Sequence, residues 1–306
     1  MTQDVATTSI VLVGPGRAGR AFARSWTRAG GSIVLVARDA PAARAFAREV
    51  SRAEVVALDS RVTFAGDVFI LAVPDDAIGP LARRLARRLA CRFGFHFSGA
   101  LGSTELAPLA DVGAKLGSLH PLRVFSGSKE DDWNDAFVAV EGDEPAARMA
   151  VRLSRHVGAR PHRLSAGGKP LYHAAATLAA GGTASLLSFA TRLWTRAGLA
   201  EEEGKSALAG LAAGAVDAVA RLPFEKALTG PVARRDVETV RLHRDALAPW
   251  PELARLYGLL ARETLRATEG RGREAEIASI LANVEPGSAS ERRRSEKQPD
   301  DRLEND

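Results

Sequence analysis

Short apolar runs and longer helical patterns alternate through the first half of the chain. Apolar runs at residues 9–14, 32–37 and 67–74 predict buried strands. Residues 17–29, 40–50 and 76–90 between and after them repeat apolar positions every three or four residues and predict helices. Weaker strands are predicted at 92–98, 115–121, 136–142 and 160–165, with a helix at 144–157. The alternation predicts an α/β fold with a doubly wound, Rossmann-type parallel sheet.

The strand patterns stop near residue 165. Helical segments follow at 169–196, 201–221, 236–246 and 251–268, and a last one at 273–284, separated by glycine and proline breaks. We therefore predict a dinucleotide-binding domain at 1–165 and an all-helical C-terminal domain at 166–284. Residues 285–306 are almost free of apolar side chains and predict a disordered, charged tail.

A glycine-rich loop lies between the first predicted strand and the first predicted helix. Gly14-x-Gly16-x-x-Gly19 has the spacing of a dinucleotide-binding turn in the context that this motif requires. The first glycine allows the tight turn, the second lets the backbone approach a pyrophosphate, and the third lets the helix pack against the sheet. The residues that we expect to contact the cofactor here are Gly14, Pro15, Gly16, Arg17, Ala18 and Gly19.

The end of the second strand indicates which dinucleotide is bound. An acid there would hold the ribose of NAD, but Ala37 stands near that position and Arg38 follows it. Arg38, helped by Arg44, favours the 2′-phosphate of NADP. Asp39 keeps NAD open as the alternative, although it is well placed to cap the next helix. Val73 and Pro74 end the third strand and are expected to border the nicotinamide half of the site.

Several longer motifs together resemble one family. They are "GPGRAG", "LAVPDDAI", "HFSGALGSTELAPLADVGAKLGSLHPLRVF", "KPLYHAAATLAAGG" and "ALTGPVARRDVETVRLHRDAL". The chain resembles Rossmann-like proteins labelled NADP oxidoreductases, with a helical C-terminal domain of formerly unassigned function. The architecture is similar to that of pyrroline-5-carboxylate reductase, ketopantoate reductase and the 3-hydroxyacid dehydrogenases, with a C-terminal domain like that of 6-phosphogluconate dehydrogenase. The resemblance implies a homodimer through the helical domain. It also implies a proton-donating lysine early in the first C-terminal helix, where Lys169 stands. The family pattern has an asparagine near Gly181, so this chain departs from it there.

Polar side chains that could act on a substrate gather in the same motifs. Lys169, His173 and Thr177 are four residues apart and share one face of the predicted helix. We expect Lys169 or His173 to donate a proton as hydride reaches a carbonyl or imine. The expected pocket residues are His96, Ser98, His120, Thr229 and Arg234. Purely structural roles stay open, because histidines often lie satisfied in a core and lysines are usually solvated.

Composition narrows the function classes. The 306 residues carry a formal net charge of +5, but the arginines are interleaved with acids along helices, which argues against nucleic acid as a partner. Cys91 is the single cysteine, the histidine spacing does not predict a metal site, and no apolar run predicts a leader or membrane span. We expect a cytoplasmic NADP-dependent oxidoreductase that reduces a small-molecule C=O or C=N substrate at the domain junction. The alternative is a non-catalytic dinucleotide-binding sensor or partner-binding protein.

Overall fold

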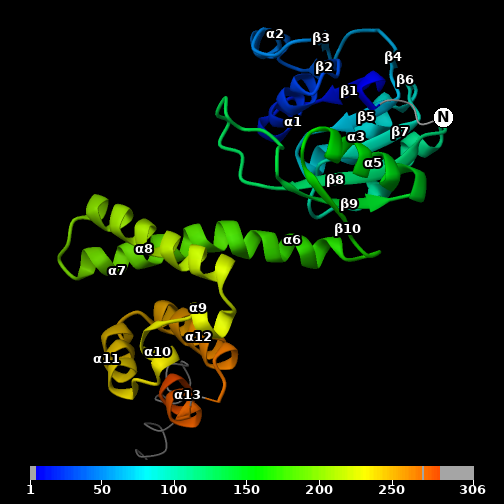
Figure 1. Ribbon diagram of the computed structural model, residues 1–306. Helices are drawn as coiled ribbons and strands as arrows, with labels where there is room; N and C mark the ends of the chain where they lie inside the picture. Colours follow the sequence, from blue (N-terminus) through cyan, green and yellow to red (C-terminus); the bar gives the residue numbers. More distant parts are fainter. Residues whose placement is uncertain (1–4, 271, 283–306) are drawn as a thin grey trace, which may run out of the picture. The chain divides into compact units, whose positions relative to one another are not determined.

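The computed structural model describes residues 5–270 and 272–282. The described residues form two compact units, which divide between Gly182 and Thr183 (Figure 1). The domain boundary after residue 165 stays a prediction, and the charged tail at 285–306 lies outside the described residues.

The first unit is built on one eight-stranded sheet with the order β10-β9-β8-β7-β5-β1-β2-β3. Neighbouring strands run parallel except β8 and β9, which pair antiparallel, so β9 and β10 run against the rest. The predicted doubly wound α/β fold is confirmed, with this reversal at one edge. The strands are β1 (Ile10–Val13), β2 (Ile33–Ala37), β3 (Ala53–Ala57), β5 (Val68–Leu71), β7 (Phe93–His96), β8 (Lys115–Leu122), β9 (Phe137–Gly142) and β10 (Arg160–Arg163).

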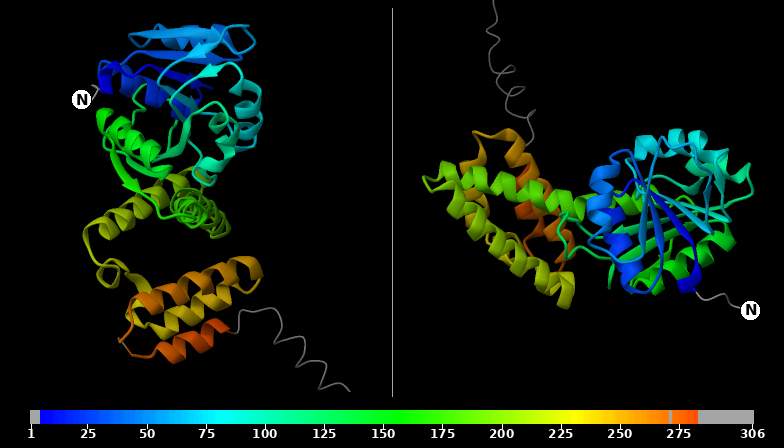
Figure 2. Two further views of the ribbon diagram at one scale, coloured as in Figure 1. Left: turned by 90° about the vertical axis from the view of Figure 1, so that its right-hand side faces the viewer. Right: turned by 90° about the horizontal axis from the view of Figure 1, so that it is seen from above.

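Helices cover both faces of the sheet (Figures 1 and 2). Ile10 and Leu12 of β1 pack with α1 and α5, whereas Val11 and Val13 pack with α3 and α4. Alternate residues of one strand therefore enter two separate cores, which explains why the strands are continuously apolar. The helices of this unit are α1 (Arg17–Arg28), α2 (Ala40–Ala47), α3 (Asp75–Ala86), α4 (Ala107–Ala110), α5 (Glu144–His156) and α6 (Lys169–Thr177), with short turns at Val5–Thr7, Ser103–Leu106 and Leu178–Gly182.

One predicted helix is too long. The pattern at 76–90 predicts a helix to Ala90, but α3 ends at Ala86. Leu89 continues the apolar repeat because it is buried in a short strand, β6 (Leu89–Ala90), which pairs with β4 (Phe64–Ala65). The sequence analysis also missed β3. These three strands are too short or too mixed in polarity for their pattern to stand out.

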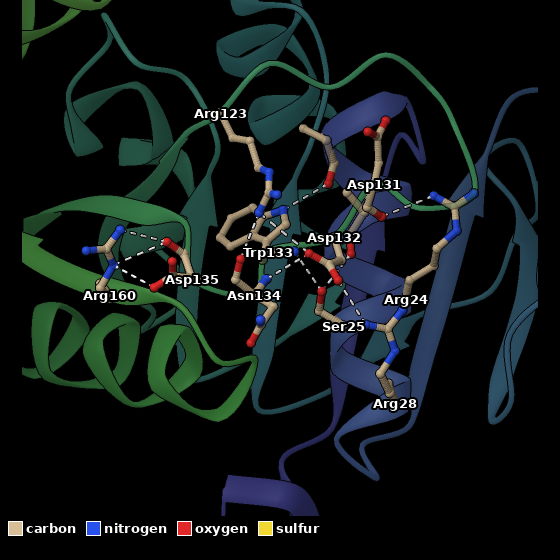
Figure 3. A network of polar contacts seen from close by, with 12 residues as sticks. Arg24, Ser25, Arg28, Arg123, Asp131, Asp132, Trp133, Asn134, Asp135 and Arg160 are labelled. Carbon is tan, nitrogen blue, oxygen red and sulfur yellow. Dashed lines mark hydrogen bonds and ion pairs between the residues drawn. The ribbon is translucent and has the colours of Figure 1, made fainter. Parts of the chain in front are cut away.

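The connection between β8 and β9 is fastened to α1 (Figure 3). Trp133 is fully buried, and its backbone N–H donates to Ser25 Oγ at 2.8 Å while its indole N–H donates to Ala18 O at 3.3 Å. Arg28 forms an ion pair with Asp132 at 2.9 Å. This connection is therefore packed against the helix that follows the glycine loop.

The second unit is helical in the residues described. Asp236 caps α11 by accepting from the backbone N–H of Thr239 at 3.1 Å, as its position after a turn predicts. A small core joins α10 to α13. The helices are α7 (Thr183–Arg196), α8 (Glu201–Arg221), α9 (Phe224–Ala227), α10 (Gly230–Arg234), α11 (Val237–Leu247), α12 (Pro251–Ala267) and α13 (Glu274–Ala282).

One helical stretch is long and apolar enough to cross a membrane by length and composition alone. It runs from Lys169 to Arg196, and its most apolar 18-residue window has a mean hydropathy of 1.2 and is only 6% buried. Such a single stretch is weak evidence for a membrane span. The predicted cytoplasmic location stays a prediction.

Candidate active site

A cavity of about 720 Å³ lies at the carboxyl ends of β1, β2 and β5. Gly14, Pro15 and Gly16 line it from the glycine loop, Arg38 from the end of β2 and Val73 and Pro74 from the end of β5. Parallel sheets bind ligands at this edge, and the volume suits a dinucleotide.

The glycine loop is shaped for close approach of a phosphate. Gly14 has φ +82°, and a Cβ there would lie 2.4 Å from Val73 Cγ1, so only glycine fits. Gly16 is exposed and caps α1 without any side-chain hydrogen bond, which leaves the first N–H groups of the helix available to an anion. Gly19 packs against Gly14 O and Ala72 Cβ, where a Cβ would lie 3.0 and 3.1 Å away. The backbone thus fits a pyrophosphate.

Not every residue predicted to contact the cofactor lines this cavity. Arg44 does not: Ala42 and Ala43 form the wall from α2, and Arg44 lies one residue farther round the helix. Arg17 lines a neighbouring cavity of about 210 Å³ with Arg20 and Arg24. Ala18 and Gly19 are absent from both linings. Arg20 and Arg84 line the main cavity but were not predicted; Arg20 could have been noticed as the next basic residue of the glycine motif.

Ser98 connects the cavity wall to Lys169. Its hydroxyl donates to Asp75 Oδ2 at 2.8 Å, and Asp75 follows Pro74 of the cavity lining. The same oxygen accepts from the N–H groups of Ala100 and Leu101, at 3.2 and 3.0 Å. The carbonyl of Ser98 accepts from Lys169 Nζ at 2.7 Å. Ser98 therefore organises the turn after β7 rather than standing free in a pocket.

Lys169 is almost completely buried, with 2% of its surface exposed. Besides Ser98, its ammonium donates to Ser118 Oγ at 2.9 Å. Desolvation lowers the pKa of Lys169 to about 8, against the opposing effect of the carboxylates of Glu141 and Asp75. The lysine thus binds the turn after β7 and the middle of β8, a placement that its sequence position did not predict.

The contacts of Lys169 extend into β9. Ser118 donates onward to Glu141 Oε2 at 3.3 Å, and Glu141 accepts from both the backbone N–H and the hydroxyl of Ser103 at 2.9 Å. The sequence analysis missed this carboxylate, although a charged residue inside the apolar run "FVAVEG" was a signal. We call Lys169, Ser98, Ser118 and Glu141 the lysine network.

Two histidines and a tyrosine meet beside the lysine network. His120, from the carboxyl end of β8, shares a hydrogen bond of 2.8 Å between Nδ1 and the hydroxyl of Tyr172. The rings of His120 and His173 are 5.6 Å apart at 85°. Both rings pack on Gly99, where a Cβ would lie 2.4 Å from His173 Nδ1 and 2.8 Å from His120 Nε2. We call His120, Tyr172 and His173 the histidine cluster.

Burial shifts the pKa values of His120 and Tyr172 in this cluster in opposite directions. Burial, together with the neighbouring His173, Lys169 and His96, lowers the pKa of His120 to about 4. Burial raises the pKa of Tyr172 to about 12. His120 is therefore neutral at pH 7 and holds a neutral Tyr172. His173 Nδ1 is buried without a hydrogen-bond partner in the structure, and Nε2 makes no hydrogen bond to the described residues.

His96 has a different position from the one predicted. It is fully buried, its Nδ1 accepts from the backbone N–H of Ser98 at 3.1 Å, and its Nε2 lies 3.0 Å from Gly102 O. Because Nδ1 accepts, the proton is on Nε2 and is donated to Gly102. Burial is the main cause that lowers the pKa of His96 to about 4, followed by the charge of Lys169. Both ring nitrogens thus hold the turn that carries Ser98 and Gly99.

The remaining candidates are Thr177 in the first unit and Thr229 and Arg234 in the second. Thr177 is exposed, although it follows His173 on the same helix. Thr229 caps α10 and Arg234 lies in its last turn, within the second unit, so their predicted contact with substrate stays a prediction. Among residues 5–270 and 272–282, no three His, Cys, Asp or Glu side chains are grouped to hold a metal.

Two family models match the chain. A Rossmann-like domain matches residues 3–121, and a domain of unknown function, DUF2520, matches residues 136–264. The chain therefore carries a Rossmann-like domain followed by a DUF2520 domain, and the resemblance predicted from its motifs is confirmed. No curated protein matches the chain.

Solved structures share the fold. A "putative NADP oxidoreductase" from Bacteroides fragilis is 23% identical, with a TM-score of 0.68 over 85% of this chain and 99% of the other. A protein from Thermotoga maritima is 24% identical, with a TM-score of 0.64 over 92% and 99%. An NADH-preferring ketol-acid reductoisomerase from an uncultured archaeon is 14% identical, with a TM-score of 0.60 over 95% and 91%. At these identities the similarity establishes the fold alone.

Proposed function

We propose that this chain, in which a Rossmann-like domain precedes a DUF2520 domain, is an NADP-dependent oxidoreductase that reduces a small C=O or C=N substrate. One observation carries the proposal. The cavity at the glycine loop and the histidine cluster lie at the same edge of the sheet. Between them Ser98, which precedes the Gly99 that both histidine rings pack on, donates to Asp75, which follows Pro74 of the cavity lining. A dinucleotide site and titratable side chains are the two parts that such a reduction needs.

The cofactor, when bound, supplies the hydride. The chain would hold its phosphates at the N-terminus of α1 and its adenosine half beside Arg38. NADP is favoured over NAD because the exposed Arg38 lines the cavity, while Asp39 is already used as the cap of α2, accepting from Ala42 N–H at 2.9 Å.

His173 is the proton donor in this proposal. Reduction of C=O or C=N leaves negative charge on oxygen or nitrogen, which a protonated imidazole can neutralise. His120 favours its neutral form and is engaged with Tyr172, so it positions the cluster. Lys169, the other predicted donor, already donates to Ser98 and Ser118, and we assign it the role of holding α6 in place.

The second candidate is a dinucleotide-binding sensor without turnover. Two observations favour it: Lys169 is engaged within the protein, and Gly181 has no side chain where the resembling family has an asparagine. Outside the adjoining helix backbone, no atom of the described residues lies within 4 Å of a Cβ built at Gly181, so an asparagine would fit there. Its absence is therefore a chemical difference and not a packing requirement.

Two measurements separate the candidates. Titration of the purified protein with NADPH and NADH, followed by nucleotide fluorescence, should give tighter binding of NADPH. Absence of binding for both would reject the dinucleotide site. A panel of keto acids, aldehydes and cyclic imines with NADPH then tests turnover, and binding without turnover across the panel would favour the sensor.

We also propose that a second copy of the chain covers the apolar side of α6. Leu171 of α6 and Leu178, the first residue of the turn at Leu178–Gly182 that follows it, are seven residues apart and are 80% and 73% exposed. A stripe of this kind is typical of helix pairing between subunits. Sedimentation should give a dimer for the wild-type chain and a monomer for the double variant Leu171→Glu/Leu178→Glu; a wild-type monomer at micromolar concentration would reject the dimer.

A further inference from the structure

The main cavity has an apolar wall contributed by α3. Asp76 lines it in the first turn of the helix, and Ala77, Leu81 and Arg84 line it with the i, i+4, i+7 spacing of one helix face. Leu58, Ala42 and Ala43 line it too. The apolar residues of this lining form a slot, and two basic residues border it: Arg38 from the turn after β2 and Arg84 from α3.

The two basic residues are available to a ligand. Neither the Arg38 nor the Arg84 side chain forms a hydrogen bond or ion pair with the described residues. The third arginine of the lining, Arg20, is engaged: its Nε donates to Pro15 O at 2.9 Å and its guanidinium lies 5.3 Å from the ring of Phe46. The nearby carboxylate of Asp39 caps α2.

We propose that Arg84 and Arg38 together form the site for the 2′-phosphate of NADP, with the adenine in the slot between them. The inference deepens the proposed function and rests on it. A phosphate monoester carries close to two negative charges at neutral pH, so a single guanidinium leaves it only partly neutralised. Guanidinium groups pair bidentately with phosphate and stack on aromatic rings, which suits both parts of this ligand.

The neighbouring Arg83 provides a matched control. It is exposed like Arg84, lies on the same helix and has the same charge, but it does not line the cavity. Its Nη1 lies beside Gly79, 3.6 Å from a Cβ built there, on the side of the helix where Glu105 also approaches. Substitution of either arginine removes one positive charge from α3, so a general electrostatic effect would be common to both.

The test compares two small probes by calorimetry, adenosine 2′,5′-bisphosphate and ADP. Arg84→Ser should weaken binding of the 2′,5′-bisphosphate about tenfold and ADP less than twofold, since one charge-assisted contact is lost. Arg83→Ser should change neither by more than about twofold. Equal losses for both probes, or no loss in Arg84→Ser, would overturn the role of Arg84.

Failure of the proposed function gives a different result. If the wild-type chain binds neither probe nor NADPH, the dinucleotide site itself is rejected. If it binds them while Arg84→Ser behaves like the wild type, only the two-arginine site fails. The double variant Arg38→Ser/Arg84→Ser adds a second readout. If both residues hold one phosphate, the loss of binding free energy in the double variant should differ from the sum of the two single losses.

Discussion

The ammonium of Lys169 donates to the carbonyl oxygen of Ser98 at 2.7 Å, across 71 residues of sequence. This bond ties the first turn of α6 to the turn after β7. Tyr172 and His173 follow within one helical turn, so the position of the histidine cluster depends on the lysine network.

Lys169→Met should change how stability depends on pH. The pKa of Lys169 is lowered from 10.5 to about 8 on folding, so between these values the unfolded chain holds the proton and the folded chain does not. The free energy of unfolding of the wild type should therefore rise from pH 8 toward pH 10, by an amount on the order of 2 to 3 kcal/mol. Chemical denaturation across this range should show the rise in the wild type and not in Lys169→Met. Lys115→Met is the control: Lys115 is exposed, so this variant should keep the rise in the free energy of unfolding.

His173→Asn should abolish most turnover while leaving NADPH binding intact. A lost general acid costs about 10²- to 10⁴-fold in rate. His162→Asn is the matched control, because His162 is exposed and stacks on Phe137, outside the cluster. Steady-state kinetics with the best substrate of the panel, beside a nucleotide titration, measures both effects. Wild-type turnover in His173→Asn would exclude His173 as the proton donor.

Gly99→Ala should displace the histidine cluster. The added methyl group would lie 2.4 Å from His173 Nδ1 and 2.8 Å from His120 Nε2, so both rings must move. We expect a loss of about 1 to 3 kcal/mol in the free energy of unfolding together with a drop in turnover. Gly102→Ala is the comparison, since its nearest contact would be Thr104 Oγ1 at 3.7 Å. Equal stability and activity in the two variants would contradict the packing described.

His96→Gln should reduce the sensitivity of the fold to acid. The pKa of His96 is lowered from 6.5 to about 4 on folding, so the unfolded chain takes up the proton first as the pH falls. Neutral His96 therefore contributes to the free energy of unfolding fully above pH 6.5, and this contribution is lost as the pH falls toward 4. For this fully buried ring the loss is on the order of 3 kcal/mol. Glutamine can still donate to Gly102 O but does not titrate. Thermal unfolding between pH 7 and pH 4.5 should therefore show a smaller decrease in Tm for the variant, and parallel curves would count against it.

The sequence predicts the parts of this molecule that depend on local pattern. Gly14 and Arg38 were identified because a glycine loop and the end of a strand have fixed spacing, and they line one cavity. Lys169 was expected in a catalytic or solvated position, because its burial depends on Ser98 and Ser118, which are 71 and 51 residues away. Arg84 was not among the predicted site residues, because helical periodicity alone does not distinguish the arginine of α3 that borders a cavity from its neighbour Arg83. Contacts between distant segments decide both cases.

Trp133→Ala should destabilise the first unit more than any of the variants above. The indole of Trp133 (Figure 3) is fully buried and packs against Phe22 and Phe97, with ring centroids 5.0 and 4.8 Å away. Its N–H donates to Ala18 O beside the glycine loop. Removing a buried tryptophan side chain costs about 3 to 5 kcal/mol, which urea denaturation would measure. Trp133→Phe keeps most of the packing and should lose about 1 to 2 kcal/mol, chiefly through the lost indole hydrogen bond to Ala18 O. Val124→Ala in the same connection is 76% exposed and should stay within about 0.5 kcal/mol of the wild type. A small effect of Trp133→Ala, comparable to that of Val124→Ala, would mean that this connection does not stabilise α1 and the glycine loop.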